Sequence, residues 1–421
     1  MNTPPPPEIR CAERNAIYSS CCGVTGEAVL TDSAVILLYA VTLGAGDSLS
    51  LLTTAVLPLL NGLLILPMAG FAPRFGSRKL VISANIFALA GYMVVAAAAF
   101  AGRWSVPAML GGILLFSVCQ TGFVAGWFPM LDSFLSPERR TLFLGRMRFF
   151  HQISAVAFLA VLSALIGRNS GVYLLQAVLF AAGCIFAGRI FFIWRIPPFP
   201  ECERVTLSYW QGLRTAVRNR PLALFSGYSF LLNCAMFGIV PLMLLCFKSR
   251  WQLADDKILL ISAAAFAGMP AGYLAAHQLR KKLGEYGVFI GIHLLLLCDL
   301  VLLFNLSPGG TASSLTATGC LMICNFCIAA NSVVAGARMM SLVTPGNKTL
   351  AMAFWGAFYY GGAGVARLGA AFLLGAGVFG SGRLPANFDR FGGILLFCIL
   401  LTLAGGLFLL FPGLWRSTRK Q

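Results

Sequence analysis

Long hydrophobic runs recur along almost the whole sequence, and short linkers that are often basic separate them. A helix needs about 20 apolar residues to cross a hydrocarbon core about 30 Å thick, and only helices and closed barrels satisfy their backbone groups there. The runs are continuous rather than short and alternating, so they favour helices over a barrel. The pattern predicts an all-α polytopic membrane protein with twelve transmembrane helices, near residues 17–43, 48–71, 80–101, 105–130, 147–168, 170–194, 221–247, 253–276, 286–306, 312–336, 349–377 and 391–415.

Composition and the placement of charge support a membrane protein and suggest its orientation. The chain is 58% hydrophobic and 11% charged, with a mean hydropathy of +0.83 and a net charge of +17. If the N-terminus is cytoplasmic, 22 of the 31 Lys and Arg residues, Arg148 among them, fall on the inner side, and seven fall in outer linkers. The remaining two, Arg189 and Arg367, fall inside helices. Positive charge collects on the cytoplasmic side of membrane proteins. We therefore expect both termini in the cytoplasm, an inner (plasma) membrane of bacterial type, and contact with anionic lipids rather than nucleic acid.

A weak internal repeat divides the chain into two halves. Residues 136–142 read Ser-Pro-Glu-Arg-Arg-Thr-Leu, and 208 positions later residues 344–350 read Thr-Pro-Gly-Asn-Lys-Thr-Leu. Each segment follows the fourth span of its half and opens the fifth, which a duplication of six spans in one orientation explains. We expect a disordered tail (1–16), two six-helix bundles (17–195 and 221–415), a linker with an amphipathic surface helix (196–220), and a C-terminal tail (416–421).

The linker after the second span carries a motif that is found in one large transporter family. Residues 70–79 read Gly-Phe-Ala-Pro-Arg-Phe-Gly-Ser-Arg-Lys, which resembles the loop between helices 2 and 3 of the major facilitator superfamily. With the number of spans and the duplication, this resemblance covers essentially the whole chain and implies that family's fold. Pro73 replaces the family's usual acidic residue, so the charge relay that commonly latches the inner gate cannot form there. The matching residues, an expected inner-gate loop, are Gly70, Arg74, Gly76, Arg78 and Lys79.

The resemblance also implies that helices 1, 4, 7 and 10 line a central cavity. Glu27 and Asp32 lie in the first span, and five residues turn an ideal helix so far that they point about 140° apart. We expect one carboxylate to face the cavity and the other to pair with a neighbouring helix. Arg367, in the glycine-rich eleventh span, could counter either carboxylate or a substrate anion. The candidate solute or ion site comprises Glu27, Asp32, Gln120, Asn233, Asn325, Asn331 and Arg367.

Each candidate also has a purely structural interpretation. Buried Asn and Gln side chains commonly bond a neighbouring helix, and a carboxylate inside a span can do the same. Cys320, Cys324 and Cys327 share one face of the tenth span, where small packing residues are favoured over a soft-metal site. We expect neither a metal nor a cofactor.

These features predict a secondary transporter that moves a small solute by alternating access and acts as a monomer, with a proton or a sodium ion as the candidate coupling ion. The family's drug–proton antiporters usually carry an arginine where Ser117 stands here, and a proline within the fifth span, which residues 147–168 lack. No nucleotide-binding loop or hydrolase motif occurs in the sequence, so we do not expect an enzyme. A non-transporting sensor or assembly protein with the same fold and a lipid flippase are the alternatives.

Overall fold

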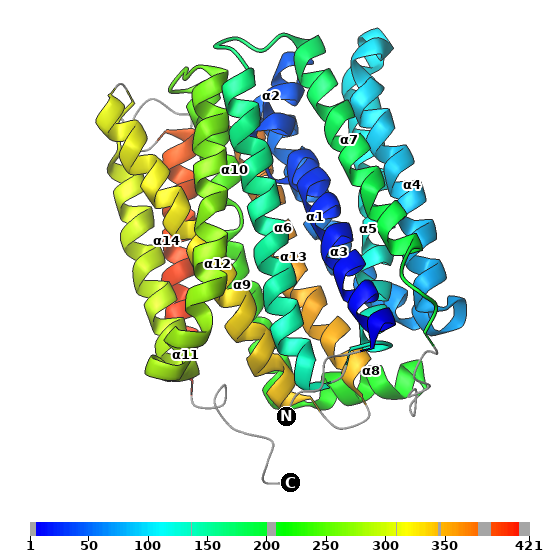
Figure 1. Cartoon of the computed structure of the whole chain (residues 1–421). Coiled ribbons are helices and arrows are strands. Elements are labelled where there is room, and N and C mark those ends of the chain that lie inside the picture. The colour runs from blue at the N-terminus through cyan, green and yellow to red at the C-terminus, as the bar shows by residue number, and fades with distance from the viewer. Residues whose placement is uncertain are drawn as a thin grey trace.

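The computed structural model of the 421-residue chain describes residues 6–135, 137–199, 208–308, 310–343, 347–377 and 389–411. Every regular element in these ranges is a helix, and most of the helices run side by side in one bundle (Figure 1). The N-terminal half contains α1 (Pro7–Thr31), α2 (Ala34–Thr42), α3 (Asp47–Phe75), α4 (Ser77–Ala97), the 3-10 helix η1 (Ala98–Trp104), α5 (Ser105–Asp132), α6 (Pro137–Leu165) and α7 (Val172–Trp194).

The C-terminal half follows a short helix that crosses one end of the bundle. This helix is α8 (Tyr209–Arg218), and it lies at the end of the bundle where α1 begins (Figure 1). We refer to this end as the α8 end and to the other as the α2 end. The remaining helices are α9 (Arg220–Met236), α10 (Ile239–Ser249), α11 (Asp255–Asn305), α12 (Thr311–Leu342), α13 (Lys348–Ala376) and α14 (Arg390–Leu409).

Helix lengths and composition fit a protein that crosses a membrane many times. Within the described ranges, eight continuous helices are long and apolar enough to span a bilayer, and the bent pair α1–α2 makes a ninth if it is one span. Two of the eight contain two predicted spans each: Ser77–Asp132 includes α4, η1 and α5, and α11 turns back at Gly284, where φ is +72°. The predicted eleventh span coincides with α13. Each of the twelve predicted spans therefore falls largely on helix.

The first helix starts earlier than expected. We predicted a disordered tail over residues 1–16, whereas α1 begins at Pro7, a residue suited to the first helical turn. Ala12 and Ala16 are fully buried, and Glu13 pairs with Arg139 of α6 at 3.1 Å. Packing against α6 therefore orders residues that looked too polar for a span. Residues 1–5 and the predicted tail at 416–421 lie outside the described ranges.

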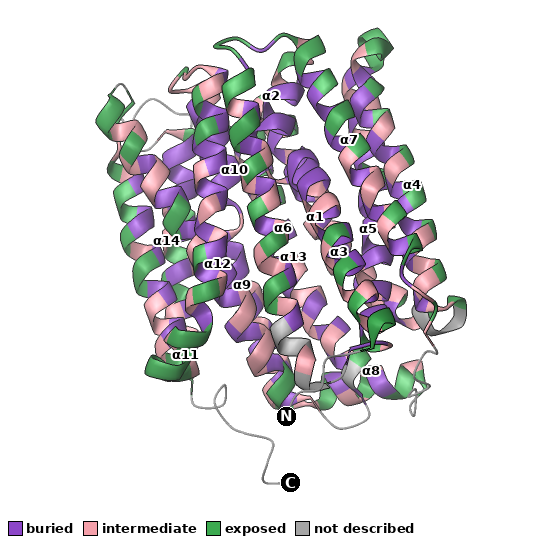
Figure 2. Cartoon of the chain, viewed as in Figure 1, coloured by how far each residue is buried: buried purple, intermediate pink, exposed green. Residues whose placement is uncertain are grey.

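Close packing of α3 against α13 joins the two halves. A Cβ atom on Gly62 would lie 2.6 Å from the Cα of Gly361, so only glycine permits this approach. The halves also pack extensively against each other through α6 and α11. Buried residues concentrate on helix faces turned toward neighbouring helices, and exposed residues on outward faces (Figure 2). Exposed apolar side chains such as Leu315, which is 73% exposed, suit a surface that faces lipid.

Candidate functional site

The first span is interrupted near its middle, at Asp32 and Ser33. The backbone N–H groups of both residues donate to the carbonyl of Ala28, and α2 restarts with the Ser33 hydroxyl accepting from the N–H of Val35 at 3.2 Å. Asp and Ser compete for backbone hydrogen bonds and so favour such breaks. The axes of α1 and α2 differ by 40°. The break therefore places Asp32 at the C-terminal end of α1, where its φ of −127° departs from the helical value.

Two prolines leave main-chain carbonyls without their normal helical donors. Pro241 has no N–H to donate to the carbonyl of Phe237, and Pro58 has none for the carbonyl of Thr54. Regular helix ends at Phe237, between α9 and α10, 205 positions after the break at Asp32. The interruption of the first span thus recurs at a similar place in the second half. Each carbonyl needs another donor, because unsatisfied backbone groups are costly inside a membrane.

Arg367 of α13 supplies both donors and also pairs with Asp32. Its Nε donates to the carbonyl of Phe237 at 3.0 Å, and its Nη1 donates to the carbonyl of Thr54 at 2.7 Å. Its Nη2 lies 2.7 Å from Oδ1 of Asp32. Asp32 and Thr54 belong to the N-terminal half and Arg367 to the C-terminal half, so this side chain adds a polar link between the halves. The Arg367 side chain is 8% exposed, whereas that of Asp32 is 37% exposed.

A second charged cluster surrounds Glu27. Its Oε2 accepts a hydrogen bond from the Gln120 amide of α5 and lies 3.6 Å from Nη2 of Arg189 of α7. Arg189 is only 2% exposed, and its guanidinium carbon lies 4.1 Å from the centre of the Phe123 ring. Gly23 makes the space for this side chain, because a Cβ atom there would lie 1.5 Å from Nε of Arg189. The Glu27 side chain is 27% exposed, so a paired carboxylate remains accessible.

The structure changes the expectation for the two carboxylates. We predicted that one would face the interior space and the other would pair with a helix, since five residues separate them on one helix. Instead, Glu27 and Asp32 are each both paired and partly exposed. The reason is that each carboxylate meets an arginine of another helix, Arg189 of α7 beside Glu27 and Arg367 of α13 beside Asp32. Gln120 and Arg367, both predicted candidates, are their respective partners.

The three candidate asparagines lie elsewhere. Asn331 donates to Oδ1 of Asn233 at 3.2 Å, and Asn233 donates to the carbonyl of Tyr359 at 2.8 Å. These bonds join α12, α9 and α13. Asn325 is 2% exposed, and its amide nitrogen has no hydrogen-bond partner within the described ranges. The structure therefore pairs Asn233 with Asn331 and leaves Asn325 apart from both charged clusters.

The expected inner-gate loop lies at the α8 end. Gly76 has φ of +78°, a conformation that favours glycine, and Gly70 packs so closely on the Tyr209 ring of α8 that a Cβ atom would lie 2.8 Å from it. Arg78 donates to the carbonyl of Trp194 at 2.9 Å. Gly76, Arg78 and Lys79 line a pocket of about 270 Å³ with residues of the 196–199 segment. The side chain of Arg74 lies outside the described part of the chain.

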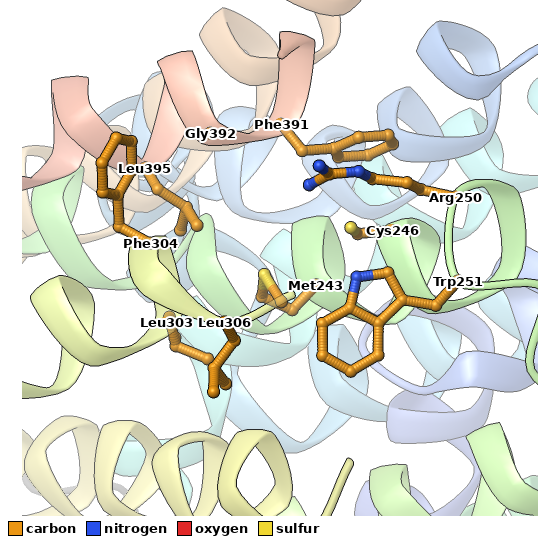
Figure 3. Close-up of a pocket in the computed structure, with 10 residues that line it drawn as sticks. All are labelled: Met243, Cys246, Arg250, Trp251, Leu303, Phe304, Leu306, Phe391, Gly392 and Leu395. Atoms are coloured by element: carbon orange, nitrogen blue, oxygen red, sulfur yellow. The ribbon is translucent and has the colours of Figure 1, made fainter. Parts of the chain in front are cut away.

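A second pocket is too small to hold a solute. It lies in the C-terminal half beside Arg250, whose Nε is 2.8 Å from Oδ2 of Asp389 (Figure 3). Its volume is about 10 Å³, which is close to the space that one water molecule needs.

Among the described residues, no group of three or more His, Cys, Asp or Glu side chains is arranged to hold a metal ion.

Sequence reasoning missed two arginines that line the interior. Arg189 was noted inside a span but given no partner, although an arginine there calls for one. Arg148 was counted with the inner linker, whereas it lies within the candidate span Phe143–Leu165 and its guanidinium carbon is 5.8 Å from the Tyr273 ring centre. The signal for Arg189 was present at Gly23, since a glycine facing a long side chain leaves room for it, but only the structure brings the two together.

These observations define an all-α polytopic membrane protein whose two halves meet at a charged, partly accessible centre. The sequence matches the Major Facilitator Superfamily over residues 20–367. The chain belongs to this family of membrane transporters. No curated protein matches it.

Solved structures share the fold across nearly the full length. A mutant of the nucleoside transporter NupG superposes with a TM-score of 0.73 at 12% identity, covering 96% of this chain and 100% of that one. A bacterial homologue of the human lysosomal transporter Spinster, inward-facing and occupied, gives 0.70 at 12% identity, covering 96% and 97%. An inward-facing bacterial homologue of the iron transporter ferroportin gives 0.65 at 14% identity, covering 96% and 99%. At these identities the similarity establishes the fold alone.

Proposed function

We propose that this protein is a secondary active transporter that moves a small solute by alternating access and couples the movement to a proton or another cation. The ion pair between Arg367 and Asp32 carries this proposal, because it joins the two halves at an accessible position within the spans. Rocking of the halves about this position requires the pair to separate. A proton or cation that binds Asp32 would compete with Arg367 and so link ion binding to the movement.

Contacts at the α2 end support one closed gate. Asp47 of α3 pairs with Arg390 of α14 at 2.6 Å and accepts from the Ser249 hydroxyl at 2.6 Å. The backbone N–H of Ala34 donates to the Ser262 hydroxyl of α11 at 3.2 Å. By contrast, among the described residues α5 does not pack extensively against α12 or α13. The exposure of Glu27 and Asp32 is therefore consistent with access from the α8 end.

The distribution of positive charge supports a cytoplasmic α8 end, with both termini inside the cell and the closed gate outside. In this proposal the bundles 17–195 and 221–415 move as units, and the linker 196–220 connects them on the inner side. The loop that contains Gly70, Arg74, Gly76, Arg78 and Lys79 would act at the inner gate, with Tyr209 of α8 resting on Gly70. The protein would act as a monomer in a bacterial inner membrane.

Uptake by proteoliposomes tests the proposal. The purified protein would be offered radiolabelled amino acids, nucleosides and organic cations, with an inward proton or sodium gradient. We expect accumulation of at least one solute above equilibrium, and Asp32→Asn should reduce it by at least about tenfold while solute exchange without a gradient persists. The swapped variant Asp32→Arg/Arg367→Asp should regain part of the accumulation because it restores an ion pair.

Two results would contradict coupled transport through this pair. One is unchanged accumulation by Asp32→Asn. The other is failure of the wild-type protein to move any solute in the panel under either gradient, which would favour a non-transporting sensor or assembly role. Movement of fluorescent phospholipid between leaflets in the same vesicles would instead support a flippase.

A further inference from the structure

Three oxygen atoms converge on the Arg367 guanidinium. They are Oδ1 of Asp32 and the carbonyl oxygens of Thr54 and Phe237, at 2.7, 2.7 and 3.0 Å from the guanidinium nitrogens. They come from three different spans in both halves of the molecule. Neither carbonyl can receive its regular helical hydrogen bond, because Pro58 and Pro241 occupy the donor positions. The oxygens therefore depend on Arg367 for a positively charged partner.

Separation of the halves would leave the Asp32 carboxylate and the Thr54 carbonyl without Arg367, whereas the Phe237 carbonyl lies in the same half as Arg367 and would keep it. Inside a membrane an unsatisfied backbone carbonyl costs several kcal/mol, and an unpaired carboxylate is costly as well. The cost would oppose the conformational change on which the proposed function rests. A ligand that replaces the guanidinium on the Asp32 carboxylate and the Thr54 carbonyl would remove this cost.

The donor set indicates the chemistry of that ligand. A carboxylate and backbone carbonyls are hard oxygen donors, which suit alkali and alkaline-earth cations rather than metals that prefer sulfur or nitrogen. The Asp32 carboxylate with the neutral Thr54 carbonyl supplies a single negative charge, so a monovalent ion leaves the site neutral. Interrupted helices with free carbonyls are known to coordinate sodium in other transporter folds. The partly exposed carboxylate of Asp32 gives an ion a route to the site.

We propose that Asp32 and the Thr54 carbonyl, together with water, form a sodium-binding site in the N-terminal half and that Arg367 occupies it as a tethered cation when the α2 end is closed. The Phe237 carbonyl keeps the guanidinium in the C-terminal half. Sodium and the guanidinium then exclude each other. Sodium binding releases the contact of Arg367 with the N-terminal half, and sodium release allows that contact to form again. The inference deepens the proposed function by naming the coupling cation, but the site itself is tested without any transport measurement.

Removal of the competing guanidinium gives the sharpest test. Arg367→Ala, purified in lipid nanodiscs, should unfold at a temperature at least about 3 °C higher in sodium chloride than in choline chloride of equal ionic strength. Potassium chloride should give a smaller increase. The double variant Arg367→Ala/Asp32→Asn should lose the sodium effect, whereas Arg367→Ala/Glu27→Gln should keep it, because Glu27 lies in the other cluster.

Direct binding of radioactive sodium provides a second measurement that does not depend on the stability of Arg367→Ala. The wild-type protein should bind ²²Na⁺ in a scintillation proximity assay, and Asp32→Asn should bind at least about tenfold more weakly. If Arg367→Ala folds, it should bind more tightly than the wild type, since no guanidinium competes. Equal effects of sodium and choline on Arg367→Ala would overturn the site, as would undiminished ²²Na⁺ binding by Asp32→Asn.

Discussion

At the scale of single residues, the two arginines of the interior have different tasks. Arg189 is enclosed within the N-terminal half, between Phe123 and the backbone at Gly23, and it keeps Glu27 paired in a position that stays accessible. Arg367 reaches across to Asp32 of the other half, and in the proposed mechanism this contact breaks when the halves separate. Glu27 is therefore suited to act as a fixed anion toward a solute, and Asp32 as the carboxylate whose partner changes.

Gly23→Ala tests how tightly Arg189 is held. The new methyl group would overlap the guanidinium, so Arg189 must move away from Glu27. Overpacking of this kind typically costs about 1–3 kcal/mol, and we expect a lower unfolding temperature in nanodiscs. Gly111→Ala is the matched control, because Gly111 lies in helix α5 with nothing within 4 Å of a Cβ atom. Its unfolding temperature should stay the same or rise; equal losses in both variants would show that Arg189 has room to move.

The sequence was informative about which charged residues matter and less so about their partners. Glu27, Asp32 and Arg367 could be selected because ionisable groups inside spans are costly. The ion pair of Arg367 with Asp32 could be named only as one of several options, because the pairing depends on how the halves meet. The two carbonyls that Arg367 binds could have been found from Pro58 and Pro241, each four residues after a carbonyl that it leaves free.

At the scale of helices, the interruptions are as informative as the spans. Apolar runs about 20 residues long predicted the spans well, because the membrane imposes that length. The start of α1 at Pro7 was not predicted, since its order comes from packing against α6 rather than from apolar composition. The break at Asp32 was also not predicted, although Asp and Ser in succession are typical of such a position. Both errors concern local departures from a regular pattern.

Pro241→Ala tests whether the freed carbonyl positions Arg367. Alanine would supply an N–H to the carbonyl of Phe237, and that bond would compete with Nε of Arg367. We expect a weaker contact between the halves and faster maleimide labelling of a cysteine at Ser48, which donates to the Ala371 carbonyl at the closed α2 end. The assay would use a background without the thirteen native cysteines. Pro129→Ala is the control, because Pro129 lies inside α5, which supplies none of the hydrogen-bond or ion-pair partners described for Arg367. The same acceleration in both variants would contradict the role of Phe237.

At the scale of the whole molecule, contacts between the halves are unevenly distributed. The ion pair of Asp47 with Arg390 links the halves at the α2 end, and the ion pair of Arg367 with Asp32 links them within the spans. The glycine contact between α3 and α13 lets the halves approach without bulky side chains between them. The proposed alternating access requires a chain of two halves to open one end while the other is closed, and an uneven distribution of contacts suits such a movement.

Cross-linking at the α2 end tests this arrangement directly. Cysteines at Asp47 and Arg390, joined by a short bifunctional methanethiosulfonate in a cysteine-free background, would hold the two halves together where the salt bridge now lies at 2.6 Å. Because the gate could no longer open, we expect solute accumulation to fall by at least about tenfold and to return when a reducing agent cleaves the link. Cysteines at Arg280 and Glu285, whose side chains pair at 2.7 Å within the C-terminal half, form the control, since their link joins no moving parts. Full accumulation by the cross-linked Asp47/Arg390 pair would mean that the α2 end does not open during transport, and the alternating-access proposal would then be wrong for this protein.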